Sequence, residues 1–268
     1  MKTLFVFLIL ILSIRHVVAF EIKGQLQPGG LIHAQLEPGS SAILNGNRLS
    51  VSEDGLLVFG FGRDASVDQV LEIKEPDGSI KRQKLTLQKR NYKVQKIYGL
   101  PKNKVIPPIA QRERIASERR LISTTRNKKT NRRDFLRGFS WPVKGRISGV
   151  FGSQRILNGV PRSPHYGLDI AAPEGTPVLA ASSGVISLAH ENMFFTGKTI
   201  LIDHGFGVST IYVHLSEISV EVGQSVERGQ LVGQVGMTGR ATGPHLHWGL
   251  SWGQVRLDPQ LVVPPMIN

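Results

Sequence analysis

Short apolar runs separated by turn sequences fill the first part of the chain. Between residues 20 and 95 the runs include SAILNG and GLLVFGFG, and turn signals recur between such runs at short intervals. The turns are Pro28-Gly29-Gly30, Pro38-Gly39, Asn45-Gly46, Asp54-Gly55 and Asp77-Gly78. Strands and turns at this spacing are typical of two packed antiparallel sheets. The pattern therefore predicts a small N-terminal β-sandwich-like domain over residues 20–95, without fixing its topology.

The pattern changes in residues 96–138, which we interpret as a connector. Prolines 101, 107 and 108 interrupt its first part, and IAQRERIASERRLIS (residues 109–123) has the spacing of a moderately amphipathic helix. The basic sequence TTRNKKTNRRD (residues 124–134) then predicts an exposed loop.

Strand-like runs return in residues 139–262, again separated by glycine-containing turns. They are TPVLAASSGVISLAH, KTILIDHG, VSTIYVHLS, SVERGQLVGQVG and HLHWGLSWG. No helical pattern is evident among them, which favours packed antiparallel sheets. The predicted fold class is all-β: an N-terminal sandwich, a basic and partly helical connector, and a C-terminal antiparallel β-sheet domain followed by a tail over residues 263–268.

The first nineteen residues predict export. Lys2 precedes an unbroken apolar run from Leu4 to Leu12, and Val17-Val18-Ala19 offers small residues for cleavage. The alternative is an uncleaved N-terminal anchor, although the run is short for a membrane span. Either reading predicts an extracytoplasmic location, in the periplasm or cell envelope.

Composition narrows the possible chemistry and partners. The formal net charge is +13, and residues 101–138 contain 12 Lys or Arg against 3 Asp or Glu, whereas residues 139–268 contain 8 of each kind. The excess therefore belongs to the connector, which favours an anionic envelope surface over nucleic acid, or a solvated linker with no specific partner. The absence of cysteine excludes thiolate metal sites, thiol nucleophiles and disulfides.

Candidate chemistry gathers in the histidines of the second half. His245 and His247 alternate within a predicted strand and so share a face, as His165 and Asp169 do in an extended segment. The pair alone could be two satisfied polar residues. Together with the carboxylate, however, these imidazoles suit Zn²⁺ with one position left open for water. On this hypothesis one member of the pair binds the metal, and the other joins His214 in acting on the water or the transition state.

Two other metal-site patterns fit the chain poorly. The H-x-H of cupin barrels requires a glutamate a few residues later, and HLHWGLSWGQ has none. The HExxH helix of other zinc peptidases is also missing. His33, His190 and His204 match no ligand position and are interpreted as structural.

The order of the motifs resembles that of the lysostaphin-type, LytM-like zinc endopeptidases, the twenty-third metallopeptidase family. The matching motifs are H-x3-D in HYGLDIAAPEGTPVLAASSGVI, then Y-x-H-L, then GMTGRATGPHLHWGL, within residues 139–262. By this resemblance His165, Asp169 and His247 are the zinc ligands, and His214 and His245 are the catalytic histidines. Residues 20–95 also resemble the β-domain that precedes the peptidase domain in Gram-negative exported members.

The resemblance implies a substrate and a reaction. Members of the family cut glycyl-glycine bridges or cross-links between the stem peptides of bacterial peptidoglycan, and a D-alanyl-diaminopimelate bond is the expectation for a Gram-negative member. The nucleophile would be a metal-bound water. All five matching positions are filled, which favours an enzyme over the alternative, a non-hydrolytic peptidoglycan-binding regulator of another hydrolase.

Three further expectations concern the surroundings of the site. Many family members place a tyrosine where this chain reads ENMFFTGKT, with Phe194 and Phe195. Arg155 and Asn158 precede His165 and are candidate substrate contacts, with a loop that satisfies its own backbone as the alternative. Because related enzymes carry built-in covers, we also expect the β-domain or the connector to shield the groove.

Overall fold

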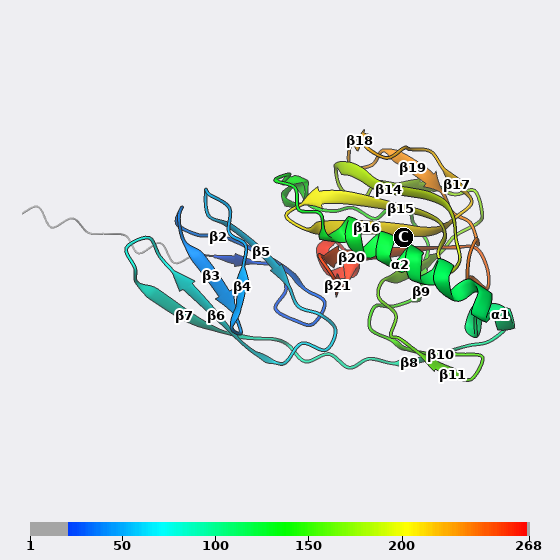
Figure 1. Cartoon of the computed structure of the whole chain (residues 1–268), viewed down its shortest axis with the longest axis horizontal. Helices are drawn as coiled ribbons and strands as arrows, with labels where there is room; N and C mark the ends of the chain where they lie inside the picture. The colour runs from blue at the N-terminus through cyan, green and yellow to red at the C-terminus, as the bar shows by residue number, and fades with distance from the viewer. Residues whose placement is uncertain (1–20, 267–268) are drawn as a thin grey trace, which may run out of the picture.

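The computed structural model describes residues 21–266 and is built mostly of β-strands (Figure 1). It confirms the predicted all-β class, with several antiparallel sheets and few helices. Residues 1–19, the predicted signal peptide, lie outside the described residues. Within residues 21–266, no helix is both long and apolar enough to cross a membrane.

The N-terminal part consists of two antiparallel sheets that enclose one apolar core. One sheet contains β1 (Ile22–Lys23), β2 (Leu31–Gln35) and β5 (Leu56–Gly60). The other contains β3 (Ser41–Leu44), β4 (Asn47–Leu49), β6 (Asp68–Lys74) and β7 (Ile80–Thr86). Alternate residues of each strand supply the core, which includes Ile32, Ala34, Leu57, Phe59, Leu71 and Ile73.

The connector is bound to the C-terminal part along most of its length. Strand β8 (Val94–Ile97) pairs in parallel with β10 (Gln154–Leu157), which pairs with β11 (Val160–Arg162). The helices are α1 (Lys102–Val105), α2 (Arg112–Asn127), and short 3-10 turns at 109–111 and 134–137. The expected exposed loop over residues 124–134 is wrong at its start, because α2 continues to Asn127 and buries Thr125 and Arg126.

The C-terminal part is organised around one large sheet. Its strand order is β18-β14-β15-β16-β20-β12-β9, and β21 pairs with β20. The bounds are β9 (Arg146–Gly149), β12 (Leu168–Ala171), β14 (Gly184–Met193), β15 (Gly197–Gly205), β16 (Val208–Leu215), β18 (Ser225–Val226), β20 (His245–Trp252) and β21 (Val255–Leu257). A smaller sheet contains β13 (Pro177–Leu179), β19 (Leu231–Gln234) and β17 (Glu217–Ile218).

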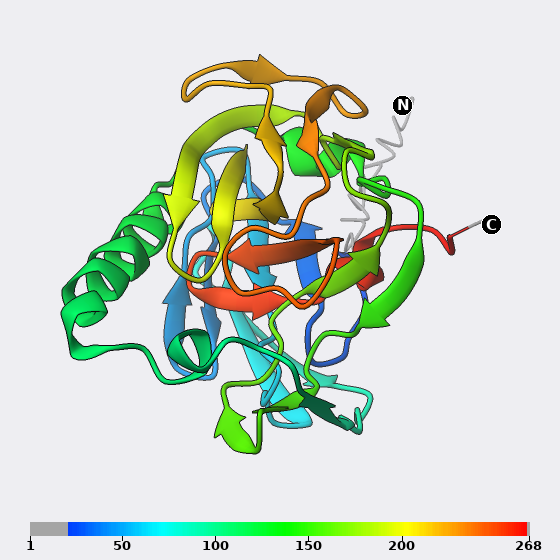
Figure 2. The ribbon, with the colours of Figure 1, turned by 90° about the vertical axis from the view of Figure 1, so that its right-hand side faces the viewer.

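Both faces of the large sheet are covered in its centre, where all eight residues of β16 are buried. One face supplies the main C-terminal core, which includes Leu168, Tyr212, Leu246, Trp248 and Leu250. On the other face Ile122 of α2 packs against an apolar cluster that includes Leu201, Ile211 and Val213. Figure 2 shows α2 along this side of the molecule. The face under α2 also carries the candidate site.

The N-terminal sheet β1-β2-β5 packs against the C-terminal core. Leu31, Leu56 and Val58 belong to the same buried cluster as the C-terminal core residues. A partly buried ion pair between Arg90 Nη2 and Asp258 Oδ2, at 2.8 Å, reinforces the contact. The two parts of the chain are therefore joined through apolar packing and not only through the connector.

Candidate metal centre and groove

The register of two strands brings a carboxylate and a histidine together. Strands β12 and β20 are antiparallel neighbours, and Asp169 lies directly opposite His247. Residues opposite each other in a sheet project to the same face. Their neighbours Leu168 and Leu246 enter the core, so Asp169, His247 and, two residues away, His245 project from the opposite face.

His165 reaches the same point from the loop before β12. Its backbone N–H donates to the carbonyl of Ser153 at 2.8 Å, and its own carbonyl accepts from the N–H of Gly152 at 2.7 Å. The ring Nδ1 lies 3.0 Å from the carbonyl oxygen of Val150. A carbonyl can only accept, so Nδ1 carries the proton and Nε2 presents its lone pair to the site.

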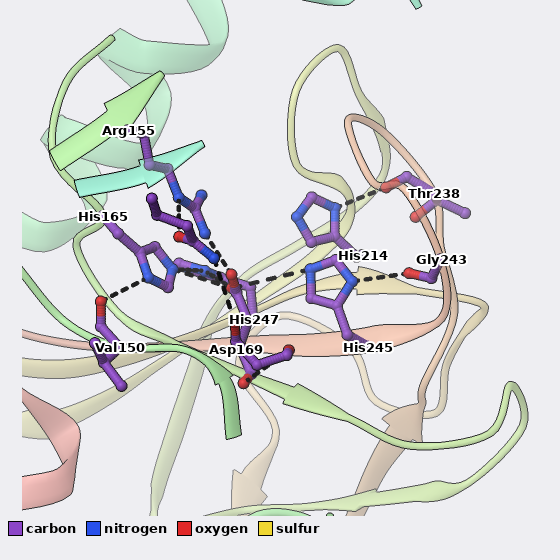
Figure 3. Close-up of polar contacts among 11 residues, drawn as sticks. Val150, Arg155, His165, Asp169, His214, Thr238, Gly243, His245 and His247 are labelled. Atoms are coloured by element: carbon purple, nitrogen blue, oxygen red, sulfur yellow. Dashed lines mark hydrogen bonds and ion pairs between the residues drawn. The ribbon is translucent and has the colours of Figure 1, made fainter. Parts of the chain in front are cut away.

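Three potential ligand atoms converge (Figure 3). The Nε2 of His165 lies 2.9 Å from the Nδ1 of His247 and 3.0 Å from the Oδ1 of Asp169, and the Nδ1 of His247 lies 2.8 Å from the same oxygen. Two neutral imidazoles and a carboxylate are a zinc-type donor set. Donor atoms around a tetrahedral zinc lie roughly 3.3 Å apart, so shifts of a few tenths of an ångström would accommodate the ion. The residues present therefore fit zinc.

Electrostatics keep this set ready to bind a cation. Burial alone would raise the pKa of Asp169, but the adjacent imidazoles, His165 foremost, hold that pKa well below its usual value. Burial lowers the pKa of His247 to about 4 despite the contact with Asp169. At neutral pH the site therefore contains an ionised carboxylate and a neutral His247, the forms that coordinate metals.

His214 and His245 lie beside the donor set, with their ring centroids 4.8 Å apart. The Nδ1 of His214 lies 2.7 Å from the carbonyl oxygen of Thr238, and the Nδ1 of His245 lies 2.9 Å from that of Gly243. Both rings therefore carry their proton on Nδ1, and Nε2 is the nitrogen that can accept one. The Nε2 of His245 lies 3.9 Å from the Oδ1 of Asp169. Burial, followed by the neighbouring histidines, lowers the pKa of His214 to about 3.

An unusual backbone conformation directs His214 into the site. Strict alternation along β16 would send His214 toward the core face, since Tyr212 is a core residue and Val213 faces α2. His214 has a φ of 67°, in the left-handed region, which breaks the alternation at the end of the strand. Such strain in a residue other than glycine persists only where the surroundings enforce it, and it is common at functional sites.

Two glycines give the site its close packing. A Cβ at Gly149 would overlap the carboxylate of Asp169. A Cβ at Gly167 would lie 2.7 Å from the Nε2 of His247 and 2.6 Å from the carbonyl oxygen of Trp248. Both positions therefore require glycine if the two ligand side chains are to keep their places.

The other predicted site residues take different positions. Arg155 donates to the Oδ2 of Asp169 and orients the carboxylate. The side chain of Asn158 bonds to the backbone of Leu100, accepting at 3.3 Å and donating at 2.7 Å, so it holds the connector. Phe195 lines the groove, whereas Phe194 is buried, and neither supplies the hydroxyl of the usual tyrosine.

The candidate centre lies between two hollows. The larger, of ≈ 680 Å³, is lined by His165, His214 and His247 together with connector residues between 105 and 119. The smaller, of ≈ 240 Å³, is lined by Asp169, His214 and His245. An extended chain could therefore occupy both sides of the centre. The connector forms one wall of this groove, and its action as a cover stays a prediction.

Sequence reasoning missed several residues that shape the groove. Arg162 and Arg240 line the larger hollow, together with Arg112 and Arg119 of the connector. Arg240 lies in the segment GMTGRATGPHLHWGL, so its closeness in sequence to His245 and His247 could have identified it as a groove residue. The family resemblance predicts that the β-domain or the connector shields the groove, but the local sequence pattern does not indicate which connector residues line it.

Comparisons with known proteins agree with this geometry. Residues 163–259 match the model of "Peptidase family M23". The catalytic domain of lysostaphin from Staphylococcus simulans is 32% identical to this chain, and the match covers 48% of this chain and 86% of that domain with a TM-score of 0.34; here the sequence identity carries the relationship. The chain belongs to peptidase family M23.

Two further proteins are similar to this chain. "Peptidoglycan DD-endopeptidase ShyA" from Vibrio cholerae is 45% identical over 113 residues, which are 41% of this chain and 26% of that protein. A crystal structure of a protein assigned to peptidase M23 from Pseudomonas aeruginosa is 29% identical, covers 88% of this chain and 93% of that chain, and has a TM-score of 0.65. The chain spans about a quarter of the length of the curated relatives it matches, whereas the Pseudomonas structure is similar along almost its whole length.

Proposed function

We propose that this protein is an exported zinc-dependent endopeptidase that hydrolyses peptide cross-links of bacterial peptidoglycan. The observation that carries the proposal is the convergence of His165, Asp169 and His247, with two further histidines beside them whose Nδ1 atoms are held by backbone carbonyls. A purely structural cluster would have no need of two unprotonated ring nitrogens facing one point. Relatives named peptidoglycan DD-endopeptidases support the substrate class.

The side chains divide the work between metal binding and proton transfer. His165, Asp169 and His247 would hold zinc, and Arg155 would keep the carboxylate in place. When bound, zinc supplies a Lewis acid that polarises the scissile carbonyl and lowers the pKa of water to roughly 7. The Nε2 atoms of His214 and His245 can accept a proton from the attacking water and return it to the leaving amine. Their Nδ1 contacts to Thr238 and Gly243 keep them in the tautomer that this requires.

The proposal extends to location. The sequence of residues 1–19 supports export to the periplasm or cell envelope, where peptidoglycan lies. The basic connector supports contact with an anionic envelope surface. Fractionation of cells that produce the full chain, with mass spectrometry of its N-terminus, tests export and cleavage together.

The decisive experiment is mass spectrometry of muropeptides released from purified peptidoglycan by zinc-loaded protein. We expect the wild type to release uncross-linked peptides. His247→Ala should lose both bound zinc and activity, whereas His245→Ala should keep zinc and lose activity by about 10²–10⁴-fold. His190→Ala, which changes a histidine outside the groove, is the matched control and should behave as the wild type.

The alternative is a non-hydrolytic regulator that uses the same groove to bind peptidoglycan. It predicts that wild-type protein with stoichiometric zinc binds peptidoglycan but releases nothing. A different result would contradict only the proton-transfer role. If His245→Ala released muropeptides as the wild type does, His245 would not be needed for proton transfer, whereas the metal-site assignment would stand.

A further inference from the structure

The larger hollow beside the candidate centre has a strongly cationic lining. Of the described residues, five arginines line it and no Asp or Glu does; they are Arg112, Arg119, Arg155, Arg162 and Arg240. Among residues 21–266, only Arg155 of these five has a carboxylate within 4.0 Å, that of Asp169. Four guanidinium groups around one hollow therefore have no anionic partner in the part of the chain that the structure describes.

Arg240 is held firmly, but no carboxylate of residues 21–266 lies within 4.0 Å of its guanidinium. Its backbone N–H donates to the carbonyl of Phe195 at 2.8 Å, and its guanidinium lies 4.5 Å from the centre of that ring. Among residues 21–266, the single hydrogen bond of the guanidinium is a long one, 3.4 Å from Nη1 to the carbonyl oxygen of Lys104. Burial, and then nearby arginines led by Arg155, lower the pKa of Arg240 to about 10, so it stays charged at neutral pH.

Arg162 is a second unsatisfied cation in the same hollow. It donates from Nη2 to the carbonyl of Val105, and its buried Nε has no hydrogen-bond partner in the described part of the chain. Like charges gathered in a partly desolvated hollow repel one another, and an anion bound between them would remove that cost. A guanidinium fork fits a carboxylate with two parallel hydrogen bonds, which an ammonium group cannot reproduce.

Arg240 is also well placed along the groove. Arg155, His214 and Arg240 line both hollows, so Arg240 lies at the passage between them. In a D-alanyl-diaminopimelate cross-link, the carbon next to the scissile nitrogen bears a free carboxylate. A glycyl-glycine bridge has no charged group at that position. A substrate carboxylate so close to the cleaved bond must lie near the histidines.

We propose that Arg240, assisted by Arg162, binds a free carboxylate of the substrate peptide next to the scissile bond and selects anionic stem peptides over neutral bridges. This inference rests on the proposed peptidase function for its choice of ligand. Arg240 is in this view a specificity-determining residue. Removing it should change which peptide is preferred and leave the metal site intact.

The test uses two synthetic cross-linked peptides that differ only in whether that group is a carboxylate or a carboxamide. Affinity is measured by fluorescence anisotropy with the zinc-loaded mature chain carrying His245→Ala, so that binding is read without turnover, and kcat/KM is measured with His245 intact. We expect the carboxylate peptide to be favoured by about 10–100-fold in both measurements. Arg240→Gln should reduce this ratio to near one, and Arg240→Lys should give an intermediate ratio.

Arg146→Gln, on an exposed position outside the groove, is the matched control and should leave the ratio unchanged. Zinc content and melting temperature are recorded for each variant, and the Arg240→Lys ratio decides the matter if Arg240→Gln does not fold. Equal losses for both peptides, or an unchanged ratio, would overturn the proposal. Failure of the peptidase function would look different: neither peptide would be cleaved by the wild type, while the binding ratio would still report on Arg240.

Discussion

Strand β5 of the N-terminal sandwich and strand β20 of the large sheet each turn one face to an apolar core, but their second faces differ. In β5, Leu57 and Phe59 enter the sandwich core, and Leu56 and Val58 enter the C-terminal core. In β20, alternate residues enter the core, whereas His245 and His247 face the groove. Burying both faces of a strand therefore does not make a site by itself.

Strand β20 differs from β5 in that its second face contains polar side chains with hydrogen-bond partners. A buried polar group is costly without a hydrogen bond. His247 finds Asp169 across the sheet, and His245 finds the carbonyl of Gly243. A site arises where an otherwise apolar layer contains polar side chains that hydrogen bonds from neighbouring strands and loops hold in place around one point.

The largest effect should come from the apolar strand. Leu57→Ala removes a fully buried side chain from the sandwich core and should lower the free energy of unfolding by about 2–5 kcal/mol. Because Leu57 does not face the C-terminal core, the folded variant should bind zinc as the wild type does. Urea denaturation and zinc titration measure the two quantities. A weakened zinc affinity in the folded variant would contradict this prediction, because it would show that the sandwich core influences the metal site.

Acid should destabilise the metal-free protein through its buried histidines. Burial lowers the pKa of His204 to about 4, whereas an unfolded histidine titrates near 6.5. As the pH falls below 6.5, the unfolded state takes up protons first, so the stability due to this group is lost between pH 6.5 and about 4, by about 3 kcal/mol.

Urea denaturation with a chelator at several pH values tests this sign and size. His204→Gln should flatten the dependence of the free energy of unfolding on pH. His33→Gln is the matched change in the N-terminal sandwich, where a half-buried histidine contacts Phe135, and it should flatten the curve less. A steeper curve for His204→Gln than for the wild type would contradict the assignment.

A smaller effect should follow from crowding the carboxylate without removing a ligand. Gly149→Ala places a methyl group against Asp169 and should weaken zinc affinity by about 10–100-fold, the size of effect expected when a supporting contact is disturbed. Gly243→Ala is the control, because a Cβ there meets nothing within 4 Å. Competition with a zinc-binding dye measures both. Equal zinc affinities for the two variants would contradict the prediction, because they would show that Asp169 can shift away from the added methyl group without loss of zinc binding.

Much of the fold could be predicted because alternation and turns are local signals. The runs KTILIDHG, VSTIYVHLS and HLHWGLSWG correspond to β15, β16 and β20. The end of α2 could not be predicted in the same way, since TTRN is polar and is followed by a basic run. Those residues stay helical because the body of the protein covers Thr125 and Arg126, a tertiary effect that the local pattern does not contain.

The candidate site was predictable in its membership but not in all of its geometry. Equal spacing correctly placed His245 and His247 on one face, and the structure brings both together with His165, Asp169 and His214. The direction of His214 depends on a left-handed backbone that alternation along β16 would have missed. The cationic lining as a whole was not predicted, because the local pattern does not tell which connector arginines lie at the groove.

The position of β20 along the chain determines when the groove can be assembled. Two of the five site residues, His245 and His247, belong to this strand. It follows every other strand of the large sheet except β21 in the sequence. During synthesis the sandwich can close on its own core long before His245 and His247 emerge. A partly made chain would thus contain His165 and Asp169 without their third companion, and it could not yet attack a peptide bond. The chain would become able to cleave a peptide only after nearly all of residues 21–266 have been synthesised.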